Sequence, residues 1–187
     1  MRCCCIVRAG ERSFPCHRLI LASVGYFQIM FFGKFVEAEK KEIELKGVNA
    51  NDFELLLTHI YGNSIKIKDD NVYRLLRISH YMGPPSLENL CVNHVIRSNS
   101  IPLDTSLCIF IFACEMKKTI LIDELIDYMA QNFLNVSKYA KFFKIPAEEL
   151  LQILTHPKLD KDSSAILDFL KIWVKSEGEE ARKLLPD

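Results

Sequence analysis

The sequence predicts an α+β fold in which a small sheet flanked by helices is followed by a purely helical region. Short extended segments with apolar or alternating residues are confined to the first 67 residues. Elsewhere, apolar residues recur at intervals of three and four, which is typical of helices. A polar break at Ser98–Pro102 separates the two patterns. We therefore expect two domains, at residues 1–98 and 99–187.

The first domain is predicted to open with a β-hairpin. Cys3–Val7 is short and apolar, Gly10 follows it, and Arg12–Phe14 is a second extended piece. From Leu19 the apolar spacing becomes helical, and we expect two short helices separated near Gly25.

The middle of this domain is predicted to add further strands and a helix. Glu42–Lys46 alternates charged and apolar residues, as a half-buried strand does. Asn51 or Asp52 is the expected N-cap of a helix that Gly62 ends. Residues 64–67 are predicted to form one more brief strand.

Helices are predicted from residue 69 onward. Asp69–Asn71 is expected to cap one helix, and Gly83–Pro85 to end it. Another helix should cover roughly residues 86–98, and Asp104 is the expected cap of the first helix of the second domain. Four amphipathic helices are then predicted from apolar stripes, so that the second domain forms a bundle or a stack of helical hairpins. The stripes lie at Leu121, Leu125, Tyr128 and Met129, at Tyr139, Phe142 and Phe143, at Leu150, Leu151 and Ile153, and at Ile166, Phe169, Leu170 and Trp173.

Composition excludes several classes of partner. Of the 187 residues, 49% are hydrophobic, which is enough for a packed core. Because 24 basic residues balance 24 acidic ones, we expect no nucleic acid or anionic membrane as a partner. No apolar run approaches the roughly 18 residues of a membrane span, and the N-terminus lacks the zones of a signal peptide. Seven cysteines, three of them adjacent, favour a reducing cytoplasm, or else the nucleus.

Two segments that contain cysteine could suggest a metal site or a catalytic nucleophile, and we expect neither. Neighbouring side chains of a strand point to opposite faces, so Cys3–Cys5 cannot converge on one metal ion. Cys16 and His17 resemble a nucleophile and a base, but adjacent residues rarely aim their side chains together. With no glycine-rich phosphate loop either, we expect no metal, no cofactor and no catalytic centre.

Both domains resemble those of a known family. The segment Phe14–Ser23, followed by Tyr26-Phe27, Met30-Phe31 and Phe35–Glu37, resembles the core of a BTB (POZ) domain. The second domain resembles the N-terminal part of the BACK domain, which follows BTB in kelch-like proteins. The residues that carry this second resemblance are Leu107–Ile109, Ala113, Asn132-Phe133, Val136, Glu149–Leu154, Leu159 and Trp173–Lys175.

The resemblance implies an adaptor, without enzymatic activity, of a cullin-RING ubiquitin ligase. BTB and the first BACK helices would hold the cullin, and a further part of the protein would hold an unidentified substrate protein. Phe35–Glu37 matches the hydrophobe-x-Glu motif with which members contact the cullin. The implied cullin-binding residues are Met30, Phe31, Phe35, Glu37 and Tyr61.

Departures from the family pattern leave alternatives open. Members exchange an N-terminal helix and strand in a homodimer, whereas this sequence starts almost at the first core strand, so a homodimer or heterodimer stays open. The acidic partner that members provide for Arg18 falls near Cys3 or Cys4, and we expect the buried charge pocket to be absent or rebuilt and Arg18 to reach solvent. The sequence stops inside BACK, before any kelch repeat, so a non-ligase scaffold, a corepressor docking module or a truncated competitor is the alternative function.

Overall fold

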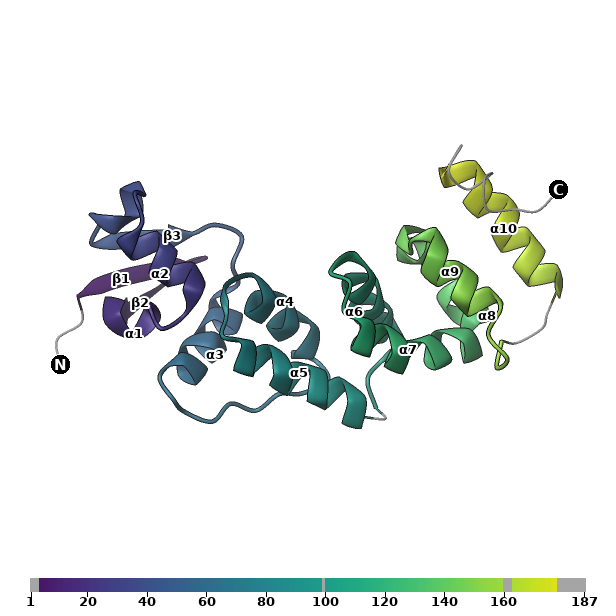
Figure 1. The fold of residues 1–187 in the computed structure, drawn as a ribbon, viewed down its shortest axis with the longest axis horizontal. Helices are drawn as coiled ribbons and strands as arrows, with labels where there is room; N and C mark the ends of the chain where they lie inside the picture. Colours follow the sequence, from purple (N-terminus) through teal and green to yellow (C-terminus); the bar gives the residue numbers. More distant parts are fainter. Residues whose placement is uncertain (1–3, 99, 160–162, 178–187) are drawn as a thin grey trace. The chain divides into compact units, whose positions relative to one another are not determined.

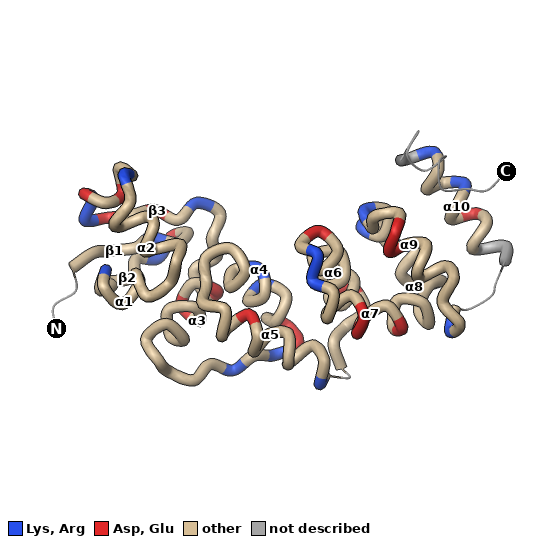
Figure 2. Tube along the Cα trace, in the orientation of Figure 1, with Lys and Arg blue, Asp and Glu red and all other residues tan. Residues whose placement is uncertain are grey.

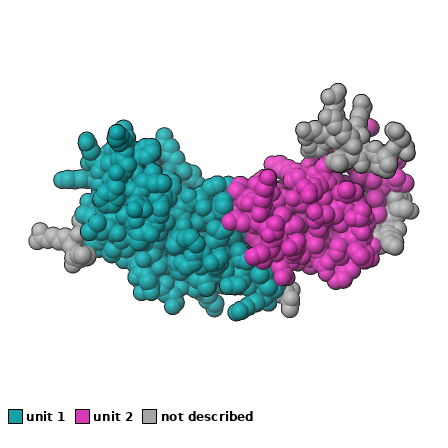
Figure 3. All heavy atoms as spheres, in the orientation of Figure 1, with its two compact units in different colours: residues 1–99 teal, residues 100–187 magenta. Residues whose placement is uncertain are grey.

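A three-stranded sheet lies in the N-terminal part of the chain, and every other regular element among the described residues is helical (Figure 1). The computed structural model describes residues 4–98, 100–159 and 163–177. The chain divides into two compact units, Met1–Asn99 and Ser100–Asp187, which Figure 3 colours separately. The α+β prediction is confirmed, because unit 1 combines the sheet with helices and the described part of unit 2 is all helical.

The sheet begins with the predicted hairpin. Strand β1 (Cys5–Ala9) pairs antiparallel with β2 (Arg12–Cys16), and β3 (Glu42–Leu45) adds parallel to the other edge of β1. Gly10 occupies the hairpin turn with φ +56°, a conformation that glycine adopts without a steric penalty. Alternate residues of β1 and β3 are buried, so one face of the sheet packs on the core.

Helices of unit 1 cover that buried face. The elements are α1 (Arg18–Leu21), α2 (Gly25–Phe32), the 3₁₀ turn η1 (Val36–Ala38), α3 (Ala50–Ile60), α4 (Val72–Met82) and α5 (Pro85–Arg97). The break between α1 and α2 lies at the predicted place, near Gly25. Phe14, Phe27 and Phe53 bring β2, α2 and α3 together: the Phe53 ring lies 5.2 Å from that of Phe14 and 6.4 Å from that of Phe27.

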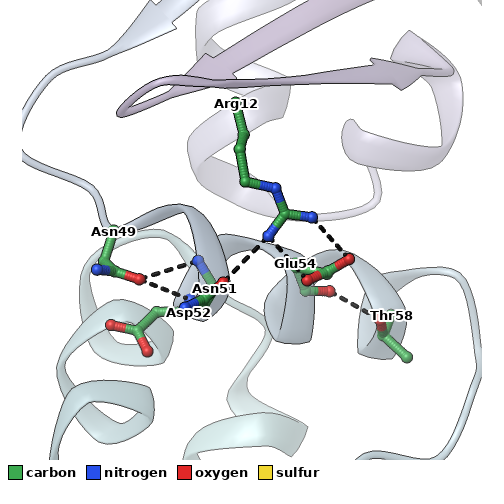
Figure 4. Close-up of polar contacts among 6 residues, drawn as sticks. All are labelled: Arg12, Asn49, Asn51, Asp52, Glu54 and Thr58. Atoms are coloured by element: carbon green, nitrogen blue, oxygen red, sulfur yellow. Dashed lines mark hydrogen bonds and ion pairs between the residues drawn. The ribbon is translucent and has the colours of Figure 1, made fainter.

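Helix α3 begins earlier than the sequence predicted. Asn49 is its N-cap, and its Oδ1 accepts hydrogen bonds from the amides of Asn51 at 2.9 Å and Asp52 at 3.4 Å (Figure 4). The prediction that Asn51 or Asp52 caps the helix is therefore wrong. Asp52 lies in the first turn and instead accepts a hydrogen bond from Arg74 Nε at 3.1 Å, which joins α3 to α4.

An ion pair joins the hairpin to α3. The Arg12 guanidinium donates to both carboxylate oxygens of Glu54, at 2.9 and 3.0 Å, and to Asn51 Oδ1 at 3.1 Å (Figure 4). This guanidinium holds the pKa of the Glu54 carboxyl below its ordinary value. Since both side chains are largely exposed, the pair orients β2 on α3 more than it stabilises the fold.

The strand predicted at residues 64–67 is wrong. This segment has no ladder partner in the sheet, whose order is β2-β1-β3. Asn71 holds the segment instead: its Oδ1 accepts from the Lys68 amide at 2.8 Å, and its Nδ2 donates to the Lys66 carbonyl at 3.3 Å. Asn71 is the N-cap residue of α4, but its side chain bonds to this loop rather than to the helix.

The described part of unit 2 is a succession of short helices. They are α6 (Leu103–Glu115), α7 (Thr119–Gln131), α8 (Phe133–Val136), the 3₁₀ helix η2 (Ala140–Lys144), α9 (Ala147–Leu154) and α10 (Ser163–Glu177). Two sequence expectations need correction: Pro102 rather than Asp104 precedes the first helix, and the Tyr139 stripe lies at a 3₁₀ rather than an α-helix.

An aromatic cluster forms the core of unit 2. Phe133, Phe142 and Phe169 contact one another edge to face, with ring centroids 5.2–5.7 Å apart. Trp173, one turn after Phe169 on α10, is buried as expected. Within the described ranges, no helix combines the length and apolar character that a bilayer crossing requires.

Candidate functional site

The segment between α2 and β3 presents an apolar side chain to solvent. Phe35 is 54% exposed and Val36 is 71% exposed, although both follow directly on a packed helix. Gly33 ends α2 and lets the chain turn there, since a Cβ at this position would lie 2.4 Å from the Ile29 carbonyl oxygen and 2.9 Å from the Phe35 ring. The close approach of ring and backbone at Gly33 helps to hold Phe35 in place.

The Arg18 side chain also contacts the segment between α2 and β3. Its guanidinium donates to the backbone carbonyls of Ala38 and Lys40 and lies 5.1 Å from the centre of the Phe31 ring. The expected pocket is therefore rebuilt with backbone carbonyls as acceptors, and Arg18 remains partly exposed, in line with the expectation that it reaches solvent. Two carbonyl oxygens and the Phe31 ring contact the guanidinium, and these contacts tie the η1 turn to α1 and α2.

Phe35 and Glu37 line one hollow of about 520 Å³. We call it the Phe35 hollow; it is lined by Tyr26, Ile29 and Met30 of α2, by Phe35 and Glu37, by Glu44–Lys46 and Val48, and by Met82 at the end of α4. Burial and the nearby Glu37 carboxylate raise the pKa of the Tyr26 hydroxyl. The lining is thus mostly apolar, and its charged groups are the carboxylates of Glu37 and Glu44 and the ammonium group of Lys46.

Charges of both signs surround the hollow. Figure 2 shows basic and acidic residues close together on the segment that joins α2 to β3. Glu37 lies 3.9 Å from Lys40, and both side chains are partly exposed. A pair of this kind contributes little to stability, so the Glu37 carboxylate is available to a partner at small cost.

The structure brings together three of the five residues implied to bind a cullin. Met30, Phe35 and Glu37 line the Phe35 hollow. Phe31 does not: it is only 4% exposed, because it packs inward beneath Arg18, and its assignment to the contact surface is corrected to a supporting role. Tyr61 lies outside the hollow at the end of α3, where its hydroxyl accepts a hydrogen bond from the His17 amide at 2.9 Å.

Several lining residues were not predicted from the sequence. Tyr26 and Ile29 share a face of α2 with Met30, and their helical spacing could have indicated this. Val48 and Met82 come from other elements, and only the packing of α4 beside the β3–α3 connection places them here.

Within the described residues, the thiols of Cys4, Cys5 and Cys16 donate to backbone carbonyls. Cys4 is exposed and Cys5 is buried, yet both thiols donate to the Cys16 carbonyl, at 3.9 and 3.6 Å, so the expectation that these two neighbouring side chains point to opposite faces is wrong. Cys3 lies outside the described residues. Cys16 Sγ donates to the Phe14 carbonyl at 3.3 Å, and His17 Nδ1 bonds instead to the Tyr61 hydroxyl at 2.9 Å. No group of three or more potential ligands converges in the part of the chain that the structure describes.

Two further thiols are held in the protonated form. Burial raises the pKa of Cys91 to about 12, and burial also raises the pKa of Cys114 to about 12. Because the thiolate is the reactive species, these two cysteines are packing residues rather than nucleophiles.

An exposed aromatic side chain lies next to a carboxylate on a small sheet-and-helix domain that is followed by helices, an arrangement typical of protein-interaction modules. Family comparisons agree with this class. The model described as "BTB/POZ domain" matches residues 2–99, and the one described as "BTB And C-terminal Kelch" matches residues 106–187. The chain belongs to the BTB–BACK family of kelch-like proteins.

The chain is similar in sequence to kelch-like proteins and to a kelch repeat and BTB domain-containing protein. The chain is 30% identical over 188 residues to Kelch-like protein 41a of Danio rerio, covering 98% of this chain and 31% of the relative. It is 25% identical over 185 residues to Kelch-like protein 41 of Homo sapiens, covering 98% and 30%. It is 28% identical over 178 residues to Kelch repeat and BTB domain-containing protein 8 of Xenopus tropicalis, covering 94% and 29%. The chain thus spans under a third of the length of these relatives.

Proposed function

We propose that this chain is a protein-interaction adaptor that binds the N-terminal region of a cullin and serves as a substrate-adaptor subunit of a cullin-RING ubiquitin ligase. The observation that carries the proposal is the Phe35 hollow, which is lined by an exposed aromatic ring, that of Phe35, and by the Glu37 carboxylate. We expect no intrinsic turnover, since ubiquitin transfer takes place on other subunits, and we expect the protein in the cytoplasm.

Phe35 and Glu37 together have the composition of an interface hot spot. Binding free energy concentrates at a few residues that combine apolar area with a directional polar group and that lose their water together. Phe35 supplies the apolar area, and Glu37 supplies an acceptor for a basic or N–H-bearing partner group. Gly33 and Arg18 hold the segment in advance, so less conformational entropy is lost on binding.

A second BTB chain is a further proposed partner of unit 1. Leu19 and Phe32 are 75% and 66% exposed, and neither lines the Phe35 hollow. Exposed apolar side chains such as these are suited to an apolar interface with another protein. They support a homodimer or a heterodimer that forms through α1 and α2.

Calorimetric titration with the purified N-terminal region of the cullin tests the adaptor function. We expect the parent chain to bind with a Kd of about 10 μM or tighter, and the Phe35→Ala, Glu37→Lys double variant to bind at least about tenfold more weakly.

A matched control makes the same two kinds of substitution on α9, which is not part of the Phe35 hollow. The Leu151→Ala, Glu148→Lys variant removes an exposed apolar side chain and reverses a charge on α9, and it should bind like the parent. If the parent gives no heat at tens of micromolar, the ligase adaptor is rejected in favour of a non-ligase scaffold, a corepressor docking module or a competitor of complete adaptors.

A further inference from the structure

A second hollow adjoins the Phe35 hollow on unit 1. It has a volume of about 300 Å³ and shares Val48 and Met82 with the first as common walls. We call it the Arg77 hollow; its other lining residues are Gly47, Asn49, Asp52, Arg74, Arg77, Ile78 and Tyr81. A partner segment that fills the first hollow therefore passes the mouth of the second.

The two arginines of this hollow differ in whether they form an ion pair. Arg74 forms one, because its Nε donates to the carboxylate of Asp52, a side chain that is only 9% exposed. Arg77 lies 5.8 Å from the centre of the Tyr73 ring, and none of the ion pairs of the described residues includes it. The hollow thus holds two guanidinium groups against one buried carboxylate, which leaves an excess of one positive charge.

The donors of this hollow fit a carboxylate. Arg74 and Arg77 are three residues apart on α4 and so lie on one side of the helix. Arg74 uses Nε for Asp52, and a guanidinium has four further N–H donors in a planar arrangement that matches two carboxylate oxygens. Ile78, Val48 and Met82 provide an aliphatic wall for the methylene groups of such a side chain.

The geometry points to an acidic side chain of the docking partner as the occupant of the Arg77 hollow. This inference rests on the proposed function, because the same cullin segment is taken to fill the Phe35 hollow and to place an Asp or Glu on Arg77. The shared walls supply the continuity, and the excess positive charge supplies the complementarity. Recognition then needs two features of the partner: an apolar anchor and a neighbouring carboxylate.

Charge reversal at Arg77 tests this inference in the intact chain. We expect Arg77→Glu to weaken binding of the cullin region about tenfold or more at about 0.05 M salt, and clearly less at about 0.5 M salt, where the charges are screened. Arg97→Glu makes the same change in net charge at an exposed position of α5 that lines neither hollow, and it should bind within about twofold of the parent. Circular dichroism checks that each variant is folded, and Arg77→Gln replaces the reversal if it is not.

The outcomes separate the inference from the proposed function. If the Phe35, Glu37 double variant loses binding while Arg77→Glu binds like the parent, the Arg77 subsite is rejected and the adaptor function stands. If the parent does not bind at all, both are rejected. A Lys substitution of one acidic cullin residue that restores binding to Arg77→Glu supports the inference. Tight binding of inorganic phosphate to the chain alone would overturn it in favour of a free-anion site.

Discussion

Replacing Phe53 by alanine is expected to lower the free energy of unfolding of unit 1 by about 3–5 kcal/mol. The Phe53 side chain is fully buried on α3 and contacts both Phe14 of β2 and Phe27 of α2. Truncation removes buried apolar area and leaves a cavity where sheet and helices meet, and three separate elements would have to move to close it.

Denaturant unfolding followed by far-ultraviolet circular dichroism measures this loss. Phe32→Ala is the matched control, since this ring is 66% exposed and its removal should cost under about 1 kcal/mol. A loss for Phe53→Ala no larger than that of Phe32→Ala would contradict a core in which the Phe14, Phe27 and Phe53 rings pack together.

The Phe133→Ala variant is expected to produce a comparable loss, about 3–5 kcal/mol, in unit 2. The Phe133 side chain is fully buried and contacts Phe142 of η2 and Phe169 of α10 edge to face. Because these contacts join α8, η2 and α10, a cavity at Phe133 loosens three elements at once.

The fluorescence of Trp173 reports on this unit selectively. It is the only tryptophan of the chain and lies buried on α10, one turn from Phe169. The Phe133→Ala variant should shift the fluorescence transition to lower denaturant, whereas Leu151→Ala, at a half-exposed position of α9, should shift it little. Equal transitions for these two variants would show that the aromatic cluster does not support α10.

Local patterns in the sequence were sufficient for most of the fold. The hairpin, the strand at 42–45 and the two short helices divided near Gly25 follow from periodicity and turn residues alone. The strand predicted at 64–67 failed because alternation favours a strand only where a partner edge is free, and Asn71 binds this backbone instead. The α3 cap was misplaced because Asn49, Asn51 and Asp52 are all good cap residues, and tertiary contacts decide among them.

The candidate site was predictable where it is local in sequence. Phe35 and Glu37 follow from one motif, and Met30 from the face of α2. Phe31 was misassigned because both it and Met30 lie near the motif, and only the position of Arg18 decides which of them faces inward. The Arg77 hollow was not predicted, since its walls come from α4, from the connection before α3 and from Asp52 in the first turn of α3.

Hydrogen–deuterium exchange of the intact chain, with and without the cullin N-terminal region, tests the central claim most directly. We expect slower exchange in the presence of the cullin region at backbone amides of residues 35–48, which include six of the residues that line the Phe35 hollow. We expect no change in α9, which carries the control residues. Binding that left residues 35–48 unprotected and slowed exchange elsewhere in the chain would contradict the claim that this segment is the docking surface.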